Sequence, residues 1–135
     1  MEIVFLIARI LLAVLVLFSA IGHLTQTAGM AQYAESRGIP MAKAGVIVSG
    51  IGLLVGGLSI LLGVYGDLGA LVLAALFVIF AFGMQTFWKE TDPMAKMNTQ
   101  ISFNKDLALA GGALAFYLVF AYVDSISWVI TGPLL

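Results

Sequence analysis

Residues 85–112 read QTFWKETDPMAKMNTQISFNKDLALAGG, and they decide the fold because they are the longest polar interruption in an apolar chain. The stretch holds three of the six basic residues and three of the seven acidic residues. Long apolar segments lie on both sides of it. It is therefore the largest polar surface that the chain offers for chemistry or for a partner.

The overall composition indicates a membrane protein. Hydrophobic residues make up 62% of the 135 residues, charged residues make up 10%, and the mean hydropathy is +1.13. Soluble domains carry about 25% charged residues, so this chain lacks the polar surface of a water-soluble globule. We expect a single membrane domain, residues 1–135, in contact with the lipid bilayer.

Residue counts exclude several function classes. The chain has no cysteine, which excludes thiol–disulfide exchange, cysteine nucleophiles, iron–sulfur ligation and cysteine zinc sites. Its single histidine cannot build a His-rich metal site, and the sequence contains no haem-ligand pair or nucleotide-binding motif. The net charge is −1 and the basic residues form no patch, which argues against a nucleic-acid partner.

Four apolar segments reach the length of about 20 residues that a helix needs to cross a membrane. We expect these spans at residues 3–24, 44–64, 68–88 and 107–123. Backbone polar groups in lipid must be satisfied within the segment, which makes the spans helices. The sequence therefore predicts an all-α fold, an up-down-up-down bundle of four transmembrane helices with two longer loops.

The distribution of charge predicts the orientation of this bundle. Loops one and three, on one side of the membrane, contain Arg37, Lys43, Lys89, Lys96 and Lys105. The opposite side contains Glu2, Asp67 and Asp124, with no Lys or Arg outside a span. The positive-inside rule then places both longer loops in the cytoplasm and both termini outside.

Both longer loops contain helix signals. In loop one, a short interfacial helix would place Met30, Tyr33 and Ala34 towards lipid and would end at Gly38. In loop three, Asp92 followed by Pro93 is an N-cap and N1 pair that predicts a second short helix.

Small residues recur every three or four positions along the second span, a pattern typical of close helix approach. The stripe consists of Gly45, Ser49, Gly52, Gly56, Ser59 and Gly63. The fourth span offers Gly111, Gly112 and Ala115. The stripes either pack inside the bundle or form the face of a homo-oligomer.

Arg9 lies about two turns inside the first span, where a charge is costly and usually faces the bundle interior or water. Asp67 and Asp124 are expected on the same side of the membrane. Arg9 therefore either forms an ion pair with one of them, reaches the outer surface, or contacts an anion or lipid headgroup.

A candidate ligand or partner site lies at the loop side, where the topology gathers polar residues from distant segments. It comprises His23, Trp88, Lys89, Asp92, Lys105 and Asp106. A quinone or a lipid headgroup fits this set, and Lys105, expected at the start of a helix, opposes the helix dipole there. The plainer interpretations are an interfacial hydrogen bond at His23, a membrane anchor at Trp88 and a solvated loop.

Three pieces of the sequence together resemble the DoxX family of small four-helix membrane proteins. They are Ala8-Arg9 followed by FSAIGHL at residues 18–24, FWKETD at residues 87–92, and FNKDLALAGG at residues 103–112. The resemblance covers nearly the whole chain. Asp106 stands where the family pattern usually has Asn.

The resemblance implies a bacterial inner-membrane protein linked with oxidoreductase systems. Relatives include a subunit of a thiosulfate:quinone oxidoreductase and a membrane component of an oxidative-stress complex. The resemblance also implies that the functional positions are Arg9, His23, Trp88, Lys89, Asp92 and Lys105.

Three functions follow as hypotheses. The first is a non-catalytic membrane subunit or anchor of a redox complex, with quinone as candidate cofactor and a soluble oxidoreductase docked at the cytoplasmic loops. The second is a small-molecule or lipid-binding membrane protein without catalytic activity. The third is a structural partner or chaperone.

Overall fold

The computed structural model describes residues 2–123, 126 and 129–133, and this part of the chain is helical without strands. The elements are α1 Glu2–Thr25, α2 Thr27–Ser36, α3 Ala42–Leu62, α4 Gly66–Met84, the 3₁₀ turn η1 Phe87–Lys89, and α5 Pro93–Tyr122. Within this part, four stretches are long and apolar enough to cross a membrane: α1, α3, α4 continued through η1, and α5. The predicted all-α fold with four spans is confirmed.

The fourth long helix starts earlier than the span expected at residues 107–123. It begins at Pro93 and runs without interruption for 30 residues. The Asp92 side chain accepts a hydrogen bond from the Ala95 backbone N–H (3.0 Å), so this N-cap starts the whole of α5 and no separate short helix. Asp106 consequently lies inside the helix, and the dipole argument for its neighbour Lys105 does not apply.

The short helix expected in loop one is present as α2, which ends where Gly38 adopts a positive φ of 81°. Its predicted orientation towards lipid was wrong for two of its residues. Ala34 is buried and Met30 packs with it against the start of α3, near Val46. Tyr33 is exposed.

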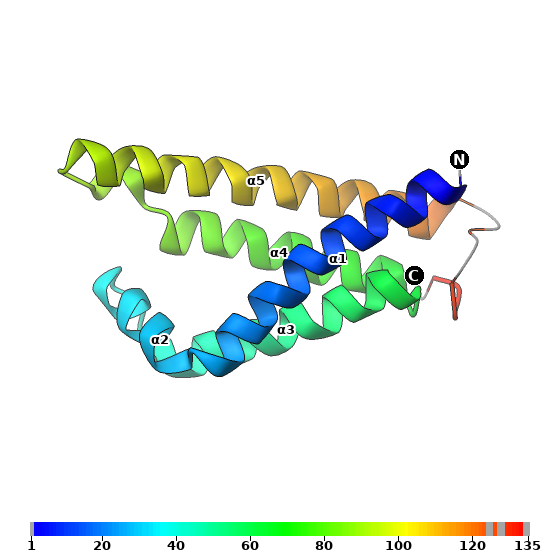
Figure 1. Cartoon of the computed structure of the whole chain (residues 1–135), viewed down its shortest axis with the longest axis horizontal. Helices are drawn as coiled ribbons and strands as arrows, with labels where there is room; N and C mark the ends of the chain where they lie inside the picture. Colours follow the sequence, from blue (N-terminus) through cyan, green and yellow to red (C-terminus); the bar gives the residue numbers. More distant parts are fainter. Residues whose placement is uncertain (1, 124–125, 127–128, 134–135) are drawn as a thin grey trace.

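The four long helices form a wedge and not an evenly closed bundle (Figure 1). In the packing order, α1 packs along α3, α3 along α4, and α4 along α5. The two outer helices meet at the end that carries the N-terminus, where the Phe5 ring lies 5.3 Å from the rings of Phe116 and Phe120. At the opposite end, beside α2, Figure 1 shows α1 and α5 far apart.

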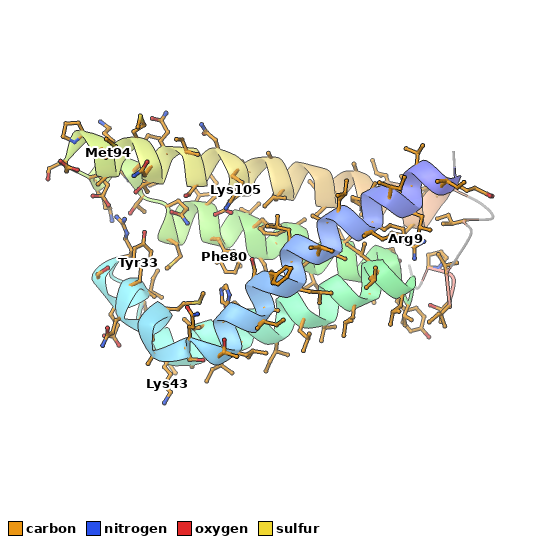
Figure 2. The ribbon with its side chains drawn as sticks, viewed as in Figure 1. Arg9, Tyr33, Lys43, Phe80, Met94 and Lys105 are labelled. Carbon is orange, nitrogen blue, oxygen red and sulfur yellow. The ribbon has the colours of Figure 1, made fainter. Side chains whose placement is uncertain are left out.

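Arg9 lies at the closed end of the wedge (Figure 2). Its side chain is fully buried, so it does not reach the outer surface. Nε donates to the Ile60 carbonyl and Nη2 to the Leu61 carbonyl, both at 2.9 Å. These carbonyls belong to the last turn of α3, where backbone acceptors lack partners within the helix. Arg9 therefore caps the carboxyl end of α3.

The ion pair predicted for Arg9 stays a prediction. Asp67 is fully buried near the start of α4. Asp124, the other predicted partner, lies outside the described residues.

The small residues of α3 serve two neighbouring helices. A Cβ atom at Gly56 would lie 2.8 Å from Leu73 of α4, and one at Gly52 would lie 3.0 Å from Leu76. On the other side of α3, a Cβ atom at Gly57 would lie 3.0 Å from Leu17 of α1. The sequence stripe omitted this second contact face of α3.

The packing expected at three other glycines is not found among the residues that the structure describes. A Cβ atom at Gly45, Gly111 or Gly112 would meet nothing within 4 Å. The reason is that the helix faces carrying them lie outside the closely packed seams of the wedge.

Candidate ligand cavity at the loop end

A cavity of about 620 Å³, here called the membrane cavity, is lined by residues of all five α-helices. Apolar side chains such as Leu53, Phe77 and Leu109 form much of its wall. Its polar lining residues include Ser19, His23, Gln26, Gln85, Lys105 and Asp106. The cavity thus combines apolar walls with a small set of polar groups, as ligand sites do.

His23 is held in place on the α1 side of the membrane cavity. Its Nδ1 atom lies 2.7 Å from the Ser19 carbonyl oxygen. Because a carbonyl can only accept, Nδ1 carries the proton, and Nε2 is the acceptor in the neutral ring. The ring stacks on Phe80 of α4 with centroids 5.6 Å apart and planes at 26°. Figure 2 shows Phe80 between the α4–α5 pair and the α1–α3 pair.

The α5 side of the membrane cavity carries a buried carboxylate. Asp106 is only 7% exposed, although its neighbour Lys105 is exposed. Gln85, at the end of α4, lines the same cavity as Asp106. His23 therefore lines the same cavity as Lys105 and Asp106, although about 80 positions separate it from these two residues in the sequence.

The other three predicted site residues lie outside the membrane cavity. Trp88 is half exposed and packs edge-to-face against Phe87 and Phe103, with centroids 5.3 and 5.9 Å apart. Asp92 is the N-cap of α5. Lys89 lines a separate polar pocket beside loop one. The structure does not gather all six predicted residues into one site.

The separate pocket, here called the outer pocket, has a volume of about 510 Å³. Its lining residues are Ser36, Arg37, Gly38, Thr86, Lys89 and Glu90. Gln85 lines the membrane cavity and its neighbour Thr86 lines the outer pocket, so the two spaces are adjacent.

A cluster that the sequence did not indicate stands between these two spaces. Arg37 forms an ion pair with Glu90, which links loop one to loop three. Its Nε and Nη2 atoms donate to the Tyr33 hydroxyl at 3.2 and 2.9 Å, and its guanidinium lies 5.1 Å from the Tyr33 ring centroid. We call Tyr33, Arg37 and Glu90 the loop clasp. The only signal in the sequence for this cluster is the predicted topology, which puts both loops on the same side of the membrane. Residues 37 and 90 belong to no common motif.

The electrostatics of the loop clasp keep Arg37 charged. Burial alone would lower the pKa of Arg37, but hydrogen bonds to Tyr33 and Glu90 outweigh it and raise the pKa above its ordinary value. The ion pair also confirms that loops one and three lie at the same end of the molecule.

Fold and cavity together define a multi-pass membrane protein of four spans with a cavity at its loop end. The DoxX family model matches residues 4–87, which is more than half of the chain, and the protein belongs to the DoxX family. The match covers α1 to α4 and ends before α5, so it is shorter than the resemblance read from the sequence, which included residues 103–112. Neither the curated proteins nor the solved structures contain a match.

Proposed function

We propose that this protein binds an amphipathic small molecule in the membrane cavity, and that a quinone is the ligand. The membrane cavity itself carries the proposal. Its volume of about 620 Å³ lies within the range of about 300–1,000 Å³ that is usual for small-molecule sites. Its largely apolar wall favours a ligand that is itself largely apolar.

The polar lining favours a flat head with oxygen atoms. The stacked His23 and Phe80 rings offer an aromatic surface for such a head. Lys105 and the side-chain amides of Gln26 and Gln85 are donors for its oxygen atoms. A quinone ring with two carbonyl oxygens fits this combination.

We further propose that the protein is the membrane subunit or anchor of a redox complex in a bacterial inner membrane. The chain has no cysteine and a single histidine, so a soluble oxidoreductase would supply the electrons. Loops one and three, with their basic residues, would dock that enzyme from the cytoplasm, and both termini would be outside. The exposed side chains of Trp88, Lys89 and Asp92 are the candidate contacts.

The second candidate function is lipid or small-molecule binding without any redox role. The same cavity supports it, because a lipid headgroup also needs donors beside an apolar wall. Binding of a quinone head without any associated oxidoreductase would favour this function.

The test is ligand retention by protein reconstituted in nanodiscs, measured by extraction and mass spectrometry. We expect co-purified quinone in the native protein and its loss in His23→Ala and Lys105→Ala. Lys96→Ala is the matched control, because Lys96 is exposed on the same helix but lines neither pocket. Equal retention in all three variants would contradict the assignment of the cavity.

A pulldown in mild detergent tests the redox complex separately. Recovery of a soluble oxidoreductase with the native protein, and its loss on changing Lys89 and Asp92, is the expected result. Recovery that is indifferent to these two residues would move the docking surface elsewhere.

A further inference from the structure

We infer that the ligand is a lipid-tailed amphiphile that enters the membrane cavity sideways from the bilayer, between α3 and α4, while the loop clasp closes the route from water. This inference rests on the proposed function and specifies how its ligand is recognised. Two residues that line the membrane cavity are also strongly exposed, namely Val48 at 67% and Ile79 at 61%. Other apolar and aromatic lining side chains are less exposed, with Leu15 at 40% and Tyr33 at 43%.

The opening of the cavity towards lipid lies where the close contact between α3 and α4 ends. At Gly56 and Gly52 the two helices are so close that an added Cβ atom would lie 2.8 and 3.0 Å from α4 side chains. Continuing the antiparallel register by one turn brings Val48 opposite Ile79. Beyond it, Gly45 lines the membrane cavity, and a Cβ atom there would meet nothing within 4 Å. The helices thus separate towards the loop end and leave a gap, here called the lateral portal (Gly45, Val48 and Ile79).

The lateral portal lies beside the polar end of the membrane cavity. Ile79 precedes Phe80, whose ring stacks on His23. A ligand can therefore place its head at His23 while its hydrocarbon tail passes between Val48 and Ile79 into lipid. A water-soluble metabolite has no group that suits so apolar a passage, whereas a tail loses nothing there.

The route from water differs in both chemistry and closure. On the loop side, the neighbouring outer pocket has a polar and charged lining. The loop clasp joins the two loops there: Tyr33 lines the membrane cavity and its hydroxyl accepts from Arg37, which pairs with Glu90 on the opposite loop. A tail would have to cross this charged barrier, so the aqueous route does not serve a tailed ligand.

The experiment compares two probes in nanodiscs that contain the full chain. One is tritiated 2,3-dimethoxy-5-methyl-1,4-benzoquinone added from water, and the other is the same ring with a decyl tail, preloaded in the lipid. Loading and release are followed by rapid filtration, with empty nanodiscs subtracted. Retention of the tailed probe by the native protein is measured first, because its absence would refute the proposed function independently of the entry route.

Substitutions then locate the entry route. Val48→Trp and Ile79→Trp narrow the lateral portal and should slow loading of the tailed probe by about tenfold. Val55→Trp and Val78→Trp are the controls, since both residues are exposed on the same helices but line neither pocket. They should leave the rates as in the native protein.

Glu90→Gln opens the loop clasp. It should speed loading of the tail-free probe from water and leave the tailed probe unaffected, and the charge swap Arg37→Glu with Glu90→Arg should restore slow entry. Unchanged rates in both portal variants, or faster loading of the tailed probe in Glu90→Gln, would overturn the inference while leaving ligand binding intact.

Discussion

Replacing Arg9 with methionine should destabilise the protein more than any single change at the loop clasp. The guanidinium makes two hydrogen bonds of 2.9 Å to the carbonyls of Ile60 and Leu61, and the side chain is fully buried. A hydrogen bond to a charged group contributes about 1.5–3 kcal/mol. Losing both should therefore lower the free energy of unfolding by about 3 kcal/mol even at the low end of that range.

The size of the effect can be read from thermal unfolding in detergent, followed by fluorescence-detected size exclusion. At about 2–4 °C per kcal/mol for a chain of this size, Arg9→Met should lower Tm by roughly 10 °C. Arg9→Lys should lower it by roughly half as much, since a compact ammonium replaces the planar fork and retains the charge.

Arg37→Met is the matched control for this prediction. Arg37 also carries an ion pair and hydrogen bonds, but it lies in a loop and its side chain is partly exposed. Such pairs contribute about 0–1 kcal/mol. A Tm for Arg9→Met that is no lower than that of Arg37→Met would refute the capping role assigned to Arg9.

Three further predictions concern topology, packing and assembly. A cysteine at Ser36 should resist an impermeant thiol reagent in intact cells and one at Gly132 should react, and the reverse labelling would invert the proposed orientation. Gly56→Leu should lower the free energy of unfolding by at least about 1–3 kcal/mol, because α3 and α4 cannot separate freely. Val55→Leu, on an exposed face of α3, should leave Tm unchanged. Equal Tm values for the two variants would place the α3–α4 contact elsewhere. Gly111→Leu should leave Tm unchanged, since a side chain there meets open space, and a smaller oligomer by light scattering would show that α5 forms a contact between copies.

The four spans were predictable because hydropathy and length are local properties of the sequence. The N-cap at Asp92 was predictable for the same reason, but the length of α5 was not. Lys105 and Asp106 read as a boundary between loop and membrane, whereas a helix continues through charged residues if their side chains find partners. Asp106 is buried in the wall of the membrane cavity, which it shares with polar side chains such as Gln85 at the end of α4.

The candidate site was predictable only in part. Topology alone brings His23 and Lys105 to the same membrane face, and the structure shows both lining the membrane cavity. The divergence of the helix pairs, which creates that cavity, depends on how α3 packs on both neighbours. The loop clasp joins residues 37 and 90, and no pattern within either loop specifies such a distant pairing.

The uninterrupted length of α5 has a mechanical consequence. Its 30 residues extend about 45 Å, whereas the hydrocarbon core of a bilayer is about 30 Å thick. Part of the helix at Pro93 therefore projects as a stiff rod past the end of α4. Asp106 lies about 20 Å along the same rod, so a force applied at the projecting tip tilts the cavity wall with it. A protein that binds this tip could therefore change the shape of the cavity by tilting α5.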